Sequence, residues 1–115
     1  MSAEERDNEQ LGIIVSYCAH LDDVATQYSL TYERLCVDAA LQDSCVLCII
    51  QIGEAIDRLS DEFKREHPGV PWSMVSSMHR HFLRGWGTFD ADVVWNALQN
   101  YIPPLRTFCE EHWRP

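Results

Sequence analysis

The chain has 115 residues and a formal net charge of −9, with 46% hydrophobic and 10% aromatic residues. That length suits one compact domain, and the apolar content excludes a disordered chain. The negative charge argues against a broad basic surface holding a nucleic-acid duplex, so DNA is not an expected partner.

The N-terminal residues 1–10 are polar and acidic, and we expect them to form a frayed tail before a domain over residues 11–115. They lack the basic-then-apolar pattern of a signal peptide, and no apolar run suggests a membrane span. The cysteines are odd in number and occupy apolar positions, which is typical of reduced thiols in a protein core. We therefore expect a cytoplasmic protein with no membrane contact. These cysteines are Cys18, Cys36, Cys45, Cys48 and Cys109.

The first expected helix carries one apolar stripe between Leu11 and Val24, with spacings of three and four residues. A polar break follows. Ser29 or Thr31 is expected to cap a short helix that begins at Tyr32.

The strongest helical pattern runs from about Asp38 to Leu59. Gly53 lies inside it at a cost in helix stability, which predicts that another backbone passes close by. Ser60 is then expected to cap a short charged helix that ends before Pro68.

Two further helices are expected, one opened by Pro71 in its first turn and one after an N-cap at Asp90. The pair Pro103 and Pro104 must kink or restart the last of them. Strand signals are absent, so the sequence predicts an all-α, single-domain up-down bundle of four to five helices. The apolar face of the helix after Pro71 is expected to comprise Met74, Val75, Met78 and Phe82.

The chemistry of the chain concentrates in the stretch M-H-R-H-F-L-R-G-W-G, residues 78–87. It places His79, Arg80, His81 and Arg84 within six positions, and residues 67–89 contain no Asp or Glu. Such a window can attract one anionic group, although the same residues would equally suit the solvated face of a short helix.

The only C-x-x-C pair, Cys45 and Cys48, lies in the middle of the expected long helix on its apolar stripe. A redox pair would begin a helix after a strand, and a structural zinc site would need two further ligands at matching spacing. Both cysteines are therefore expected in the core, and no metal or cofactor is expected.

Four segments in this order resemble the HepT-like family of bacterial HEPN domains. They read I-G-E-A-I-D-R-L-S, then D-E-F-K-R-E-H-P-G-V-P-W, then M-x-R-x-x-L-x-G-W, then F-D-A-D-V-V-W. The resemblance extends over nearly the whole chain from Leu11 onward. The combination of I-G-E-A with H-P-x-x-P-W is its most specific part.

This resemblance implies a small helical toxin that forms homodimers and cleaves cellular RNA without a metal. It also implies a cognate partner, an MntA-type nucleotidyltransferase antitoxin encoded beside it. In the family motif, M-R-N-x-x-x-H-x-Y, arginine and histidine from both protomers meet at the dimer cleft. The tyrosine is the residue that the antitoxin can adenylylate.

The chain departs from this motif at each key position. His79 stands at the arginine position, Arg80 at the asparagine, Arg84 at the histidine and Trp86 at the tyrosine. Arginine and histidine have thus exchanged places. The tyrosine hydroxyl that would accept the adenylyl group is missing, because Trp86 stands at its position.

RNA cleavage needs a base near the 2′-OH and cations around the phosphate, and histidine and arginine suit these roles. His79 or His81 could supply the base, and Arg80 and Arg84 could bind the phosphate. Residues five apart on a helix point about 140° apart, however. Exchanging the arginine and the histidine therefore moves the base to a different side of the cleft. Two interpretations follow: an endoribonuclease toxin, or an inactive member that serves as a dimeric binding partner of a nucleotidyltransferase.

Two more residues are candidates for a cleft or an interface. Glu54, in the I-G-E-A segment, could line the cleft, pair with an arginine or face solvent. Trp86 could pack in the core, anchor an interface or stack on a base. His67, before Pro68, is expected to fix a turn.

Overall fold

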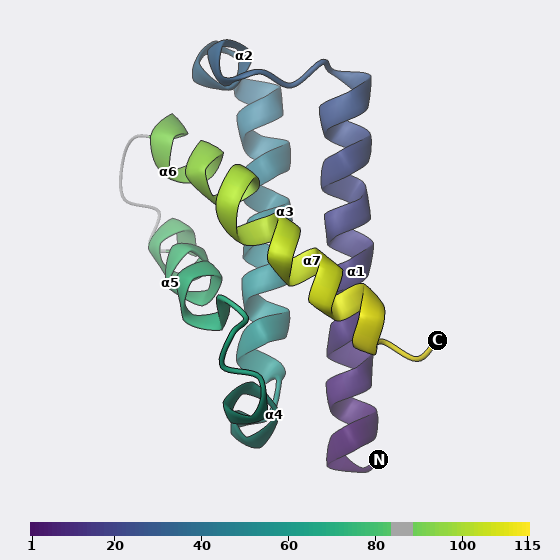
Figure 1. Cartoon of the computed structure of the whole chain (residues 1–115). Coiled ribbons are helices and arrows are strands. Elements are labelled where there is room, and N and C mark those ends of the chain that lie inside the picture. The colour runs from purple at the N-terminus through teal and green to yellow at the C-terminus, as the bar shows by residue number, and fades with distance from the viewer. Residues whose placement is uncertain (84–88) are drawn as a thin grey trace.

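The structure, a computed structural model, describes residues 1–83 and 89–115 (Figure 1). Over these residues it is helical and contains no strand, which confirms the predicted all-α class. A five-residue π-helical turn, η1, joins two of the helices. The elements are α1 (Ala3–Gln27), α2 (Tyr32–Val37), α3 (Ala39–Arg58), α4 (Asp61–Glu66), α5 (Trp72–Leu83), α6 (Ala91–Asn96), η1 (Ala97–Tyr101) and α7 (Ile102–His112).

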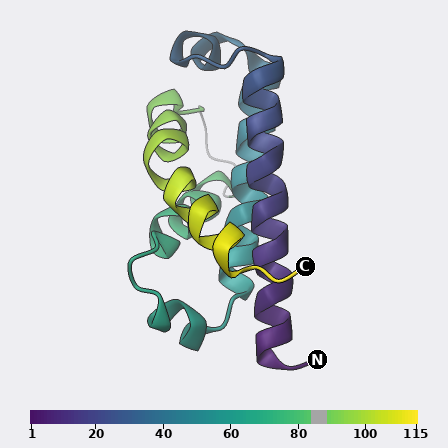
Figure 2. The same cartoon turned by 45° about the vertical axis from the view of Figure 1, so that its right-hand side comes forward.

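The two longest helices, α1 and α3, run antiparallel side by side. The other long elements cover one face of this pair: α5 packs on α3, and the continuous path α6–η1–α7 crosses both (Figures 1 and 2). The short helices α2 and α4 lie at opposite ends. This arrangement places α5, which carries His79, Arg80 and His81, directly against α3.

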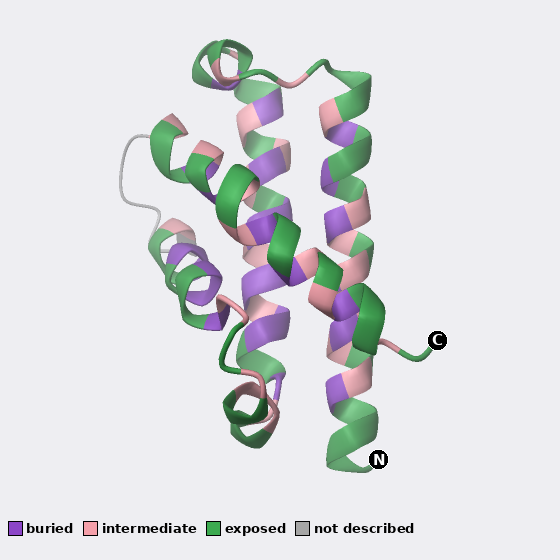
Figure 3. Ribbon diagram, in the orientation of Figure 1, coloured by how far each residue is buried: buried purple, intermediate pink, exposed green. Residues whose placement is uncertain are grey.

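The core is centred on α3, whose inward residues are almost fully buried (Figure 3). Ile49, Ile52 and Ile56 have no more than 1% of their surface exposed. By length and composition α3 is the one described helix that could cross a membrane. Its buried apolar side chains form the centre of the core, and α1 and α5 are its main neighbours.

Three predicted N-caps are present. Thr31, Ser60 and Asp90 each accept hydrogen bonds from backbone N–H groups in the first turn of the helix that follows. Of the two candidates before α2, the structure selects Thr31. Ser29 instead has a φ of 51°, in the left-handed region that suits a turn.

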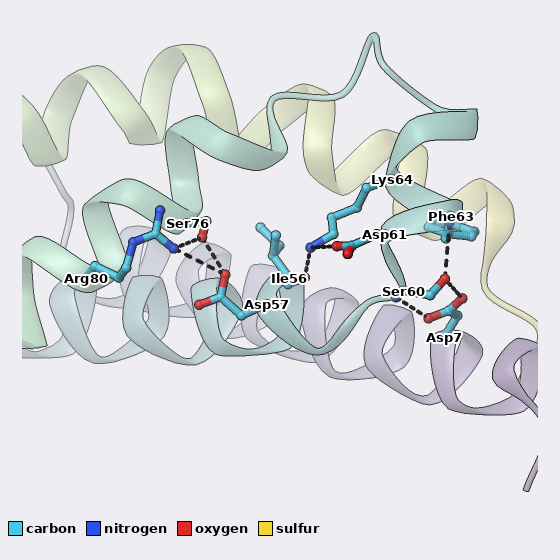
Figure 4. Close-up of polar contacts among 9 residues, drawn as sticks. All are labelled: Asp7, Ile56, Asp57, Ser60, Asp61, Phe63, Lys64, Ser76 and Arg80. Atoms are coloured by element: carbon cyan, nitrogen blue, oxygen red, sulfur yellow. Dashed lines mark hydrogen bonds and ion pairs between the residues drawn. The ribbon is translucent and has the colours of Figure 1, made fainter.

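The frayed tail predicted for residues 1–10 is wrong as a description of their conformation. Helix α1 begins at Ala3, and Ser2 and Glu5 form a reciprocal capping box. Asp7 is buried, and its two carboxylate oxygens accept hydrogen bonds from the backbone N–H (2.8 Å) and hydroxyl (2.7 Å) of Ser60 (Figure 4). The acidic start of the chain is thus tied to the α3–α4 turn.

The π-helical turn η1 follows from the two prolines. Pro103 and Pro104 have no N–H, so the carbonyl of Gln99 has neither an α-helical nor a π-helical donor. The N–H of Ile102 bonds to the carbonyl of Ala97, five residues back. The helix then restarts as α7, which confirms the predicted restart at this pair.

Four of the five thiols are buried, as predicted for Cys18, Cys45, Cys48 and Cys109. Burial raises their pKa values from 9.0 to about 12 for Cys18 and Cys109 and about 11 for Cys45 and Cys48. The prediction is wrong for Cys36, which lies exposed on α2.

Candidate functional site

The predicted close approach at Gly53 is confirmed, and its partner is His79 on α5. A Cβ atom at Gly53 would lie only 2.1 Å from the Cβ of His79. Glycine is therefore required for α5 to approach α3 this closely. The contact fixes the register of α5 along α3, so that the turn of α5 with His79 lies against the turn of α3 with Gly53.

His79 is buried, with 4% of its surface exposed. Its Nε2 lies 3.2 Å from Oδ2 of Asp57 on α3, so the imidazole and this carboxylate are in direct polar contact. Its Nδ1 is also buried and has no hydrogen-bond partner among the described residues. The imidazole at the family's arginine position therefore connects α5 to α3 and does not face solvent.

Asp57 also organises Ser76 and Arg80, both on α5 (Figure 4). The Ser76 hydroxyl donates to Oδ1 of Asp57 at 2.5 Å, and Nη1 of Arg80 donates to the Ser76 Oγ at 2.7 Å. Nη1 of Arg80 also lies 3.5 Å from Oδ1 of Asp57. The Arg80 side chain is still 53% exposed, so it is anchored at one end and open to solvent at the other.

His81 is exposed and lies on a different face of α5. It lines a groove of about 380 Å³ between α5 and the α6–η1 segment, whose walls are mainly apolar. Ser77, Asp90, Asn96 and Tyr101 also line this groove. His81 is thus the accessible imidazole of the described part of the motif.

The remaining candidates are less connected to this cluster. Glu54 pairs with Arg58 on its own helix at 3.6 Å, rather than with an arginine of α5. Its side chain is 31% exposed, so this contact is a surface pair. Arg84 and Trp86 lie outside the described residues, and their predicted roles stay predictions.

Sequence reasoning missed Asp57 and Ser76, although the chain contained a signal for both. Asp57 lies four residues after Gly53, one helical turn along the same face, so it must look toward α5 as the glycine does. Ser76 lies four residues before Arg80 and shares its face in the same way. A glycine that predicts a close helix contact therefore also predicts that polar residues one turn away on the same face lie at that contact.

His67 packs in an aromatic cluster with Phe63, Phe108 and His112, and its carbonyl accepts a hydrogen bond from Nε1 of Trp72. The carbonyl contact fixes the α4–α5 turn in the way the sequence suggested. In the described part of the chain, no group of three His, Cys, Asp or Glu side chains is placed to hold a metal ion.

Over the described residues, the fold and site define a small all-α bundle in which one helix carries His79, Arg80 and His81 and packs against the helix with the I-G-E-A segment. The sequence profile described as "Ribonuclease HepT-like" matches residues 14–112, and the chain belongs to that family. No solved structure matches the chain.

Curated relatives are distant but cover most of the chain. A Thermococcus cleftensis protein named "Probable ribonuclease HepT" is 26% identical over 99 residues, covering 79% of this chain and 90% of its own length. A Caldanaerobacter subterraneus protein that is named as an RNase is 26% identical over 82 residues, covering 71% of this chain and 73% of its own length. Both names point to ribonuclease activity in those proteins.

Proposed function

We propose that this chain is a HepT-like protein whose catalytic site for RNA cleavage is inactive, which we call a lapsed centre. Its role is that of a homodimeric binding partner of a nucleotidyltransferase, within a bacterial toxin–antitoxin setting and in the cytoplasm. The observation that carries the proposal is the burial of His79 against Asp57.

A general base must reach the proton that it removes, at about 2.6–3.2 Å or through one water. In His79 the Nε2 is engaged by Asp57, and the Nδ1 is buried. Exposing the ring would break the contact with Asp57 and separate α5 from α3 at Gly53. The exchanged motif therefore offers no substrate-facing base at its first position.

The partner part of the proposal rests on the family and on the surface around the α5 groove. Met74 and Val93 flank this groove with 46% and 37% of their surfaces exposed. Exposed apolar side chains that gather around a groove are typical of protein contact surfaces. The four buried thiols suit a reducing compartment.

A second candidate function is RNA cleavage with His81 as the base. It is favoured by the exposed side chain of His81, which lines a groove together with Ser77 and Tyr101. Under this hypothesis the base lies three positions before the family's histidine position, and Arg80 or Arg84 binds the phosphate. The ribonuclease names of the relatives support this candidate as well.

Expression of the chain alone in bacteria separates the two functions. Growth and RNA integrity are followed for the wild type and for His79→Ala, His81→Ala and Arg84→Ala, with soluble protein levels measured for each. A lapsed centre predicts normal growth and intact RNA from abundant, folded protein. Growth arrest relieved by His81→Ala at unchanged protein level would establish the second function instead.

The partner claim has its own test. The purified chain is mixed with the nucleotidyltransferase encoded nearest to its gene, and the mass of the complex is measured by light scattering. A stable complex containing two copies of this chain is expected. A monomeric chain that does not bind the enzyme would contradict the proposal even if RNA stays intact.

A further inference from the structure

The segment that follows α7 lies against α1 (Figures 1 and 2). It begins at Trp113, whose backbone is extended, with φ −70° and ψ 135°. The side chain of Asn8 binds the backbone of Arg114 at two points. Its Nδ2 donates to the carbonyl oxygen, and its Oδ1 accepts from the N–H, both at 2.8 Å. One side-chain amide on α1 thus pairs with both backbone groups of a single residue.

Gly12, one turn further along α1, makes room for the indole of Trp113. A Cβ atom at Gly12 would lie 2.7 Å from Nε1 and 3.0 Å from Cε2 of this ring. Glycine inside a helix lowers helix stability relative to alanine, so an interior glycine is expected where another group comes close. The same face of α1 therefore binds peptide backbone through Asn8 and admits an aromatic side chain at Gly12.

We propose that this Asn8–Gly12 face of α1 is a binding site for an extended peptide segment that carries a tryptophan. Residues 113–114 of the chain itself occupy the site in this structure. The ligand that displaces them is a segment of a partner protein with the same chemistry, a tryptophan followed by a basic residue. The inference goes beyond the proposed function, because it concerns α1 rather than the α5 groove and involves no RNA.

The two contacts divide the work of recognition. Extended peptides are commonly held by main-chain hydrogen bonds, which give affinity, and by side-chain pockets, which give specificity. Asn8 supplies the main-chain bonds and accepts any residue there. Gly12 supplies the specificity, because the space left by its missing Cβ receives a flat ring, and tryptophan offers a large contact area with few rotatable bonds.

The surroundings of the site indicate which ligands it takes. A groove of about 490 Å³ adjoins Asn8 and Arg114, and its lining includes Phe63 of α4. It leaves room for a segment longer than the two docked residues. Glu4 and Glu5 also line this groove, and their negative charge suits a basic residue at the position of Arg114. Arg114 is exposed and Asn8 is partly exposed, so a ligand can reach both.

The test supplies the segment in trans. The peptide of residues 110–115, E-E-H-W-R-P, is titrated into the isotopically labelled full chain carrying Trp113→Ala, and NMR follows the amide shifts of Asn8 and Gly12. A segment that stays docked in cis has a dissociation constant no larger than its effective concentration, which is on the order of 1 mM for a short link. Saturable shifts with a midpoint on the order of 1 mM or below are therefore expected. The wild type should need at least about twice as much peptide, because its own segment competes.

Matched controls separate the site from general stickiness. Adding Gly12→Ala to Trp113→Ala should abolish the shifts, because the new Cβ fills the space that the indole needs. Adding Ser16→Ala, an exposed change further along α1, should leave binding intact. A peptide with alanine in place of its tryptophan should not bind. The amide spectrum shows that each variant is folded.

A second measurement leaves Trp113 in place. Gly12→Ala alone should displace the docked segment and make exchange of the Arg114 backbone N–H about fivefold faster, the effect of losing one ordinary hydrogen bond. Ser16→Ala should leave this exchange rate unchanged.

Four results would overturn the inference: no saturable shifts in Trp113→Ala, equal binding with and without Gly12→Ala, equal midpoints for Trp113→Ala and the wild type, or unchanged Arg114 exchange in Gly12→Ala. None of these involves RNA or the nucleotidyltransferase, so failure here is distinguishable from failure of the proposed function.

Discussion

At the scale of single residues, Asp57 determines what the motif helix can do. One of its oxygens receives the buried His79, and the other faces Ser76 and Arg80. A carboxylate used in this way holds one imidazole away from solvent and fixes one guanidinium at the surface. Under the proposed function, the same residue accounts both for a histidine that does not serve as a base and for an anchored cation.

The contact between Gly53 and His79 makes a sharp stability prediction. Gly53→Ala should lower the free energy of unfolding by about 2 kcal/mol, because overpacking costs more than the roughly 1 kcal/mol that alanine returns in helix propensity. Urea unfolding measures this. The matched control is Gly69→Ala, where a Cβ meets nothing within 4 Å, and where a change under about 0.5 kcal/mol is expected. Equal effects of the two changes would contradict the close helix contact.

Thiol reactivity gives a second test at this scale. With a disulfide reagent such as DTNB, one thiol should react quickly in the native protein, and the other four only after unfolding. Exposed Cys36 is the expected fast group, so Cys36→Ser should remove the fast phase. A fast phase that persists in this variant would show that a core thiol is accessible.

Much of the site could not be predicted because the buried face of α5 is set by α3. The sequence placed Met74 in the apolar stripe and His79 among polar residues, yet Met74 is 46% exposed and His79 is buried. His79 lies one turn after fully buried Val75, on the same face. The pattern of α5 alone did not reveal that Gly53 makes room there and that Asp57 supplies a partner.

At the scale of elements, local sequence signals were the dependable ones. The caps at Thr31, Ser60 and Asp90, and the restart at the proline pair, depend on neighbours within a few residues, and the structure bears them out. The helical start of α1 was missed although Ser2 and Glu5 form a local capping box, and its other support is distant in the sequence. Asp7 is buried by Ser60, 53 residues away, and a polar sequence carries no sign of that contact.

The link between α1 and α4 can be measured through Asp7. Asp7→Ala leaves the backbone N–H and hydroxyl of Ser60 without their acceptor, and should cost about 2 kcal/mol of unfolding free energy. Glu9→Ala, an exposed change on the same helix, should cost less than about 0.5 kcal/mol. Thermal or urea unfolding compares them, and similar values for both would mean that the carboxylate contributes nothing to holding α4.

At the scale of the whole molecule, the buried thiols predict how stability depends on pH. Their folded pKa values of about 11 to 12 lie above the unfolded value of 9.0. The stability they contribute is therefore fully present below about pH 9 and is lost as pH rises toward the folded values, because the unfolded thiols ionise first. Urea unfolding between about pH 8 and 10.5 should show this loss. Cys18→Ala should lose less over that range than the wild type, and an identical loss would contradict the assignment.

The central claim, that the motif histidine has become a residue of the core, can be tested by histidine modification with diethylpyrocarbonate read by mass spectrometry. In the native protein His81 should react rapidly, while His79 stays unmodified until the chain is unfolded. An unmodified His79 peptide from the native protein would confirm that no base is available at the first motif position. Reaction of native His79 at the rate of His81 would show that its imidazole reaches solvent, and the lapsed centre would have to be abandoned.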